Sequence, residues 1–267
     1  MMAGRVMRVL TWSLAPVALS SCAIGTVNAD LSSARSTLAP TGVLRIAVHR
    51  GSPSSLLQES PEAQRRGVAF ELGRALAARL GVEYEVVVHG SNPEALAAVA
   101  EGRADFAFTN ATPERARAMD LAKPVLVVHK SVLVPSGSRL SDLAALSRQP
   151  ARVGALAGST TAIEFARLYP LVTMVPISSL PVALRALRSG EIDALAANNA
   201  ILYELGDQLP GSKVLAGSWG SERFGIGVPK GRGVAHEFLQ KFSESIASDG
   251  TLSDAVARAG LRGVDQP

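Results

Sequence analysis

The sequence predicts an α/β protein built from two similar lobes, and three observations lead to this prediction. The chain has 267 residues, of which 47% are hydrophobic, and this is enough for two lobes with separate cores. From residue 42 onward, short apolar runs alternate with helical patterns, as in βαβ units on a parallel sheet. A set of residues in the first half also recurs at identical spacing in the second half.

The first 21 residues have the pattern of a secretory signal peptide. The segment 1–8 contains two arginines but no acidic residue, and residues 9–19 are almost wholly apolar. An apolar run of this length is too short to cross a membrane as a permanent helix, and no later run is long enough. We therefore expect export to the periplasm.

Two processing sites are compatible with this signal. The sequence Leu19-Ser20-Ser21-Cys22 resembles a bacterial lipobox, in which the cysteine is lipidated and anchors the mature protein to the membrane, and Cys22 is the single cysteine of the chain. Alternatively, cleavage after Ala29 satisfies the small-residue rule and removes Cys22. Residues 30–41 are small and polar without a hydrophobic period, so the segment 22–41 is expected to be a tether.

The elements expected next follow from periodicity and from helix boundary residues. Residues 68–80 carry an apolar side chain at every fourth position, and Gly81 follows where a helix end favours a left-handed residue. Asn92-Pro93 and Thr112-Pro113 each combine an N-cap residue with a proline at the first helical position. The expected strands are short apolar runs at 43–48, 83–88 and 104–108.

The internal repeat places equivalent residues in the two halves of the chain. A strand that begins with an arginine and leads to a Gly-Ser pair occurs at residues 45–52 and again at 152–159. Each half also has a helix that ends at a glycine, followed by a strand and by an asparagine just past that strand. The matching positions are Leu96, Val99, Gly102, Asp105 and Asn110 in the first half and Leu184, Leu187, Gly190, Asp193 and Asn198 in the second. Because open α/β sheets bind ligands beyond the carboxyl ends of their strands, the repeat predicts a binding cleft between two facing lobes.

Seven segments of the chain, taken in order, have the sequence pattern of one protein family. The segments are 42–48, 67–81, 96–120, 153–161, 187–198, 224–230 and 249–252. They resemble family 3 of the bacterial extracellular solute-binding proteins, the receptors of ABC importers, many of which carry amino acids. The resemblance implies a periplasmic-binding-protein type II fold, in which two hinge strands join two Rossmann-like lobes. It also implies a monomer without a cofactor that captures a small solute and delivers it to an ABC permease in the inner membrane.

The resemblance sets the expected lobe boundaries as well. Lobe one comprises residues 42–130 together with 222–267, which return to it after the second lobe. Lobe two comprises residues 131–221. The two hinge strands are expected near residues 130–134 and 219–228.

Arg115 is the residue expected to bind a carboxylate of the solute. In this family, the arginine of a Thr-Pro-Glu-Arg helix opening has that role, and Arg115 is the matching residue. A guanidinium beside the free N–H groups of a helix start is well suited to hold an anion by two hydrogen bonds. The alternative is an exposed arginine that forms an ion pair with Glu114 or Asp120.

Five further residues are implied to contact the solute. Ser159 and Thr160 resemble the second carboxylate clamp of the family, with ordinary helix capping as the alternative. Asn110 matches a position of lobe one from which small polar residues bond the ligand. His49 and Arg50 stand where the family covers the ligand, although both are also compatible with a solvated loop.

Asn198 is the position at which this chain departs from the family. Amino-acid binders usually place an aspartate there to pair with the ammonium group of the ligand, and an asparagine has no charge. Losing that charge-assisted bond would cost roughly 1.5–3 kcal/mol of binding. Either the amine is paired elsewhere, or the solute is a carboxylate without an ammonium group or a polar neutral compound.

Composition excludes several classes of protein. The chain has 27 basic and 23 acidic residues, and two of the basic ones lie in the signal, so nucleic-acid binding has little support. One cysteine excludes a disulfide scaffold, and the histidines have no metal-ligand spacing. No Gly-x-Ser-x-Gly elbow of a serine hydrolase occurs.

Two other functions remain as alternatives. Some proteins of this fold are enzymes, such as dehydratases of prephenate-like acids, and acid–base chemistry would need a carboxylate in the cleft. Glu71 is the one acidic residue considered for that role, although its place at a helix start indicates a structural one. The second alternative is a partner that presents its ligand to a membrane sensor.

Overall fold

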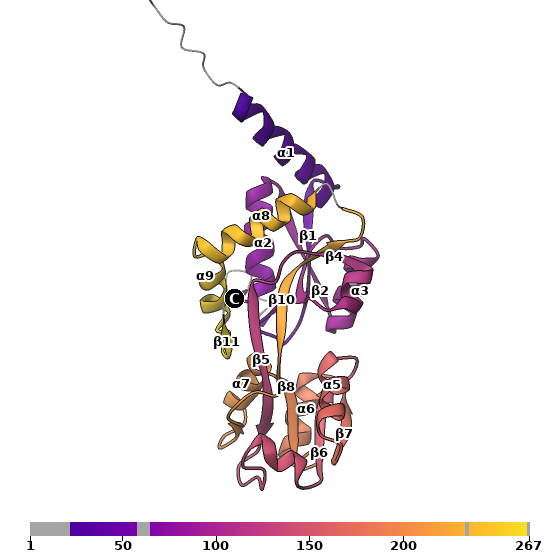
Figure 1. Ribbon diagram of the computed structural model, residues 1–267, viewed down its shortest axis with the longest axis vertical. Helices are drawn as coiled ribbons and strands as arrows, with labels where there is room; N and C mark the ends of the chain where they lie inside the picture. The colour runs from indigo at the N-terminus through magenta and orange to yellow at the C-terminus, as the bar shows by residue number, and fades with distance from the viewer. Residues whose placement is uncertain (1–21, 58–64, 233–234, 266–267) are drawn as a thin grey trace, which may run out of the picture.

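The computed structural model describes residues 22–57, 65–232 and 235–265, and side chains from residue 30 onward (Figure 1). The predicted signal peptide and the side chain of Cys22 lie outside this description. The described chain is an elongated α/β molecule with two groups of strands and helices, one above the other in Figure 1. Within these residues, no helix is long and apolar enough to cross a membrane.

The upper group in Figure 1, which we call lobe one, comes from the first half of the chain and from its C-terminal end. Its first two strands, β1 and β2, are parallel over their whole length, as the expected βαβ unit requires. Its elements are β1 (Val43–His49), α2 (Val68–Leu80), β2 (Glu83–His89), α3 (Asn92–Ala100), β3 (Ala107–Asn110), α4 (Pro113–Ala118), β4 (Met119–Leu121), α8 (His236–Ser248), α9 (Thr251–Ala259) and β11 (Val264–Asp265).

The lower group, which we call lobe two, has the same alternation of strands and helices. Strand β6 pairs parallel with both β7 and β8, so the prediction of parallel βαβ units is confirmed here too. Its elements are the 3₁₀ helix η2 (Leu143–Ser147), β6 (Ala151–Leu156), α5 (Thr160–Leu168), β7 (Val172–Ile177), α6 (Leu180–Ser189), β8 (Ala194–Asn198), α7 (Asn199–Asp207) and β9 (Lys213–Val214).

Two long antiparallel strands, β5 (Leu126–Val134) and β10 (Gly220–Pro229), run between the lobes. Strand β10 continues against β3 and β4 of lobe one, whereas β5 continues against β8 of lobe two. A nine-stranded sheet therefore passes through both lobes. These are the strands expected as hinges, and the expected lobe boundaries at 130/131 and 221/222 fall within them.

Each lobe has its own hydrophobic core. In lobe one, Leu76 of α2 is buried in the same cluster as Leu239 of α8 and Leu252 of α9, so the C-terminal helices pack on the first lobe. In lobe two, the sheet is covered on both faces, with Leu187 in one cluster and Phe165 in the other. Apolar burial therefore stabilises the lobes separately, and β5 and β10 connect them.

The prediction of a tether over residues 22–41 is wrong for most of that segment, because helix α1 spans Cys22–Leu38. The side chains of Ala34 and Leu38 are buried against lobe one. Arg35 donates from Nε to the carbonyl of Leu80 at 2.7 Å, and Arg232 donates to the carbonyl of Leu38 at 2.9 Å. The segment has few large apolar residues, so its periodicity is weak, and tertiary contacts rather than its own pattern hold it on the lobe.

The internal repeat corresponds to the same set of contacts in each lobe, in which an arginine on a strand pairs with an aspartate and donates to a glycine carbonyl. We call this set of contacts the arginine–aspartate clasp. In lobe one, Arg45 donates from Nε to Oδ2 of Asp105 at 2.7 Å and from Nη2 to Oδ1 of Asp105 at 2.9 Å. The same Nη2 also donates to the carbonyl of Gly102 at 2.8 Å. The clasp thus ties strand β1 to the turn that precedes β3.

Lobe two repeats this clasp with Arg152, Asp193 and Gly190. Arg152 Nη2 donates to Oδ1 of Asp193 at 2.9 Å and to the carbonyl of Gly190 at 2.7 Å. In both lobes, the backbone N–H of the aspartate donates to the carbonyl of the arginine at 2.8 Å. The repeat read from the sequence therefore corresponds to a shared local structure.

Candidate functional site

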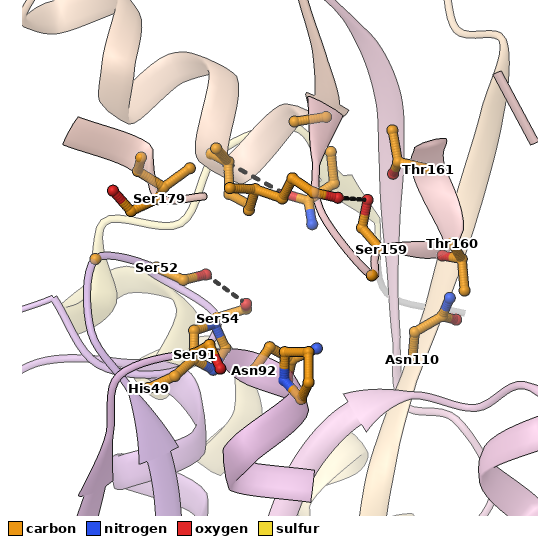
Figure 2. A pocket seen from close by; sticks show the side chains of 18 of the residues that line it. His49, Ser52, Ser54, Ser91, Asn92, Asn110, Ser159, Thr160, Thr161 and Ser179 are labelled. Atoms are coloured by element: carbon orange, nitrogen blue, oxygen red, sulfur yellow. Dashed lines mark hydrogen bonds between the residues drawn. The ribbon is translucent and has the colours of Figure 1, made fainter. Parts of the chain in front are cut away.

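A cavity of about 340 Å³ lies between the two lobes (Figure 2). All seven residues predicted from the sequence to contact a solute line this cavity. They are His49, Arg50, Asn110, Arg115, Ser159, Thr160 and Asn198. Topology explains why they meet, since His49, Asn110 and Asn198 stand at the carboxyl ends of β1, β3 and β8.

The side chain of Arg115 folds back toward strand β3 and the cavity. Its Nη1 donates to Oγ1 of Thr109 at 2.7 Å and to the carbonyl of Asn110 at 3.0 Å. Among the described residues, Arg115 forms no ion pair. The predicted alternative, an ion pair with Glu114 or Asp120, is therefore not formed, and Asp120 pairs with Lys230 instead. Neutral partners leave the positive charge of Arg115 available to an anion in the cavity.

Burial is the main influence on the charge of Arg115. It lowers the pKa of the guanidinium, and the carboxylates of Glu222 and Glu114 act against this shift. Arginine remains protonated at neutral pH despite such a shift. The six-residue helix α4 is too short for a strong dipole, so the guanidinium itself is the principal anion donor at this end of the cavity.

The second-lobe wall is built on the start of helix α5. Ser159 is the N-cap of that helix: its hydroxyl accepts from the N–H of Ala162 at 3.4 Å and donates to the carbonyl of Leu156 at 2.6 Å. The capping alternative for Ser159 is therefore realised, although the residue also lines the cavity. Thr160, which follows it, donates from Oγ1 to Glu222 at 3.5 Å.

The two repeat asparagines are both buried at the cavity wall. Asn110 Oδ1 accepts from the backbone N–H of Arg223 at 3.0 Å. Asn198 caps helix α7 by accepting from the N–H of Ile201 at 3.2 Å, and its Nδ2 donates to Oε2 of Glu222 at 2.8 Å. Both asparagines thus contact β10, the second connecting strand.

Glu222 is a cavity residue that the sequence reasoning missed. It lies on β10, its exposed fraction is 8%, and it is the single acidic residue among the described residues that line the cavity. Its place in the predicted second hinge strand was the available signal. Glu71, the acidic residue considered from the sequence, does not line the cavity and forms ion pairs with Arg74 and Arg258.

A buried cation stands behind Glu222. Lys130 on β5 is fully buried, and its Nζ lies 2.5 Å from Glu164 and 3.9 Å from Glu222. The same ammonium lies 5.0 Å from the ring centroid of Trp219. Trp219 donates from Nε1 to the carbonyl of Ser131 at 3.0 Å and does not line the cavity, so it packs the connection between the lobes.

The first-lobe wall contributes neutral polar groups. Burial lowers the pKa of His49 to about 4, and the positive charge of Arg115 adds to this effect, so the imidazole is neutral at physiological pH. Ser52 and Ser54 share a hydrogen bond of 2.8 Å at the same wall (Figure 2). The apolar part of the lining includes Phe108 and Phe224, whose ring centroids are 5.5 Å apart.

Among the described residues, no three histidine, cysteine, aspartate or glutamate side chains are grouped in a way that could hold a metal. The lining combines separate acidic and basic groups, hydroxyls and apolar surface, which is the composition of a site for a small polar molecule.

Comparisons with known proteins give a consistent family. A model of the bacterial extracellular solute-binding proteins, family 3, matches residues 44–259 of the chain. The glutamine-binding protein GlnH of an ABC transporter of Bacillus subtilis is 28% identical over 143 residues, which cover 54% of this chain and 52% of GlnH. The match thus spans about half the length of that relative. A probable histidine-binding protein of Neisseria gonorrhoeae is 22% identical over 94% of this chain and 96% of its own length.

Solved structures extend the similarity over most of both chains. The solute receptor for L-cysteine of Neisseria gonorrhoeae is 25% identical, with a TM-score of 0.72 over 86% of this chain and 92% of that one. An ancestral arginine-binding protein bound to glutamine superposes with a TM-score of 0.70 at 24% identity, over 83% of this chain and 98% of that one, which supports the two-lobed fold alone.

Proposed function

The chain belongs to the bacterial extracellular solute-binding proteins, family 3, and we propose that it is the receptor of an ABC importer. Its solute in this proposal is a small molecule with a carboxylate, namely an amino acid or a related organic acid. The observation that carries this proposal is the cavity between the lobes, into which Arg115 brings a guanidinium without a carboxylate partner among the described residues. The names of the relatives, which bind glutamine and L-cysteine, support the same class of solute.

Capture proceeds in two steps in this proposal. The solute first binds lobe one, residues 42–130 with 222–267, where Arg115 and Asn110 hold its carboxylate. Lobe two, residues 131–221, then closes over it about β5 and β10. The ligand favours the closed state by as much as it binds that state more tightly than the open one.

Closure brings the second-lobe residues onto the bound solute. Ser159, Thr160 and Asn198 approach it from lobe two, and His49 and Arg50 cover it from lobe one. All five line the cavity, which supports these assignments. In this proposal the chain acts as a monomer without a cofactor, does no covalent chemistry and passes the solute unchanged to a permease in the inner membrane.

Replacing Arg115 tests the proposed carboxylate site. Arg115→Ala should weaken binding of the solute by roughly 2–4 kcal/mol, because a charge-assisted pair in a desolvated site is lost. The measurement is isothermal titration calorimetry with solutes identified by mass spectrometry of what co-purifies with the protein. Arg117→Ala is the matched control, since Arg117 is exposed on the same helix and does not line the cavity. Unchanged affinity of Arg115→Ala would remove this residue from the site.

An enzymatic role is the second candidate, and the acidic Glu222 in the cavity is the observation that favours testing it. A dehydratase acting on a prephenate-like acid would need such a carboxylate as a proton donor or acceptor. Incubation of the purified protein with prephenate distinguishes the two functions. Binding that saturates without loss of substrate supports the receptor, whereas turnover that Glu222→Gln abolishes supports the enzyme.

Location and anchoring form a separate part of the proposal. We expect a periplasmic protein that is exported through its N-terminal signal and, in one of the two processing routes, is held to the membrane by a lipid on Cys22. Mass spectrometry of the mature N-terminus separates the routes, because a lipidated Cys22 and a free N-terminus after Ala29 differ in mass. A role as the ligand-presenting partner of a membrane sensor would appear as co-purification with that sensor in place of a permease.

A further inference from the structure

We propose that Glu222 binds the ammonium group of the solute and thereby makes the protein selective for α-amino acids over carboxylates that lack an amine. This inference rests on the proposed function. It supplies, from the connecting strand β10, the negative charge that is absent at position 198.

The hydrogen bonds of Glu222 leave room for a ligand. Its Oε2 accepts from Nδ2 of Asn198 at 2.8 Å, and its Oε1 accepts from Thr160 at 3.5 Å. An ionised carboxylate has about four acceptor sites, so these two bonds orient the group without saturating it. Because Asn198 and Thr160 both line the cavity, they hold the carboxylate at the cavity wall.

The balance of charge also favours a cation at this place. Lys130 is buried beside two carboxylates, and its Nζ is closer to Glu164 than to Glu222, at 2.5 Å against 3.9 Å. Glu164 is half exposed and does not line the cavity, so the closer ion pair of Lys130 lies behind the wall and Glu222 is the carboxylate that faces the cavity. A buried charge without a full partner is unfavourable, and the ammonium group of a ligand would neutralise it.

The other charged end of the cavity completes the match. Arg115 has neutral hydrogen-bond partners, and burial lowers its pKa while the carboxylate of Glu222 opposes this shift, so the two groups act on each other through the cavity region. A solute with one carboxylate and one ammonium group pairs with both at once. This pairing is the physical basis for selecting a zwitterion.

The asparagine at position 198 is the partner that this arrangement needs. An aspartate there would place two carboxylates at hydrogen-bond distance from each other, where they repel. The amide instead donates to Glu222 and fixes its direction. Asn198 and Glu222 therefore act as a unit, with the charge on the connecting strand instead of on lobe two.

The first measurement needs no variant. The mature protein is titrated with the twenty standard L-amino acids and with the corresponding acids that lack the α-amino group, starting with L-glutamine against 4-carbamoylbutanoate and L-cysteine against 3-mercaptopropionate. The amino acid that binds best should bind roughly ten- to a hundredfold more tightly than its des-amino acid. Equal affinity, or tighter binding of the des-amino acid, overturns the proposal.

Variants then assign the effect to Glu222. Glu222→Gln should lose roughly ten- to a hundredfold in affinity for the best amino acid while its affinity for the des-amino acid changes less than about threefold. Glu191→Gln is the control, because Glu191 is an exposed carboxylate of lobe two that does not line the cavity. Its affinities should stay close to those of the native protein. Retained selectivity in Glu222→Gln overturns the assignment.

A variant that moves the charge distinguishes the loss of an ammonium partner from misfolding of the protein. The double variant Glu222→Gln with Asn198→Asp moves the carboxylate to the second lobe and should recover part of the lost affinity for the amino acid. Far-ultraviolet circular dichroism reports whether each variant folds. If neither amino acids nor des-amino acids bind the native protein, the proposed function fails and this inference falls with it. If des-amino acids bind through Arg115 without any preference for the amine, the proposed function stands and this inference alone fails.

Discussion

Asn110 and Asn198 occupy equivalent positions in the two lobes, yet they hold different parts of the same strand. Asn110 accepts a hydrogen bond from the backbone of Arg223 at 3.0 Å, whereas Asn198 donates to the side chain of Glu222 at 2.8 Å. Adjacent residues of β10 thus receive one contact from each lobe. The first contact fixes the backbone of the connecting strand, and the second orients a charged side chain at the cavity. Equivalent positions of a repeat therefore differ in role because different groups face them.

The arginine–aspartate clasps differ in a similar way. Asp105 has no exposed surface and pairs with two guanidinium groups, those of Arg45 and Arg232. Asp193 retains 26% exposure of its side chain and pairs with Arg152. The clasp of lobe one joins β1 to the segment after β10, so it stabilises the return of the chain to the first lobe, whereas the clasp of lobe two is local.

The largest expected effect tests this difference between the clasps. Asp105→Ala should lower the free energy of unfolding by roughly 3–5 kcal/mol, because it leaves two partly buried arginines without their carboxylate. Asp193→Ala should lower it by only about 1 kcal/mol, since water replaces the lost partner. Urea unfolding followed by circular dichroism measures both. Equal losses for the two variants would show that the deeper burial of Asp105 does not make its clasp contribute more to stability than the clasp of Asp193.

A second effect concerns His49 and the residue at its position in lobe two, Leu156. The unfolded chain protonates this histidine near pH 6.5, whereas burial lowers its pKa in the folded protein to about 4. Between these two pH values the unfolded state binds more protons than the folded state. The contribution of His49 to the free energy of unfolding is therefore complete above pH 6.5, and it falls by roughly 3 kcal/mol in all as the pH drops toward 4.

The variant His49→Leu gives lobe one the residue that lobe two carries and isolates this contribution. Thermal unfolding between pH 7 and pH 4 should show a smaller loss of stability in the variant than in the native protein. Parallel curves for the two proteins would mean that His49 titrates normally in the folded state.

The smallest expected effect compares the two asparagines themselves. Asn110→Ala removes the acceptor for the Arg223 N–H, and Asn198→Ala removes the N-cap of helix α7, so each should cost about 1 kcal/mol of stability. Urea unfolding again measures the loss. The two variants should differ in binding, since Asn198→Ala alone frees Glu222 and should change the preference for an ammonium group. A preference altered by Asn110→Ala to the same extent would contradict the division of roles.

Much of the fold was predictable because its signals are local. The glycine after residues 68–80 ends helix α2 with φ of 66°, as expected from its position, and the proline-containing openings start α3 and α4. Thr112 caps α4 as predicted, whereas the N-cap of α3 is Ser91 and not Asn92, which is the first residue of the helix. The tether was predicted wrongly, because a helix of small residues has little periodicity and α1 depends on bonds to the carbonyls of Leu38 and Leu80. Those bonds come from residues that are distant in the sequence.

The candidate site divides in the same manner. The sequence by itself determined which residues follow the carboxyl ends of the strands, since spacing fixes that, and the repeat therefore led to Asn110 and Asn198. The resemblance to the family implied Arg115. Only the tertiary structure decided what those residues face. Glu222 and Lys130 are far apart in the chain and meet because β5 pairs antiparallel with β10. Pairing between distant strands depends on how the whole sheet closes, and no local pattern encodes the charge that stands beside an asparagine.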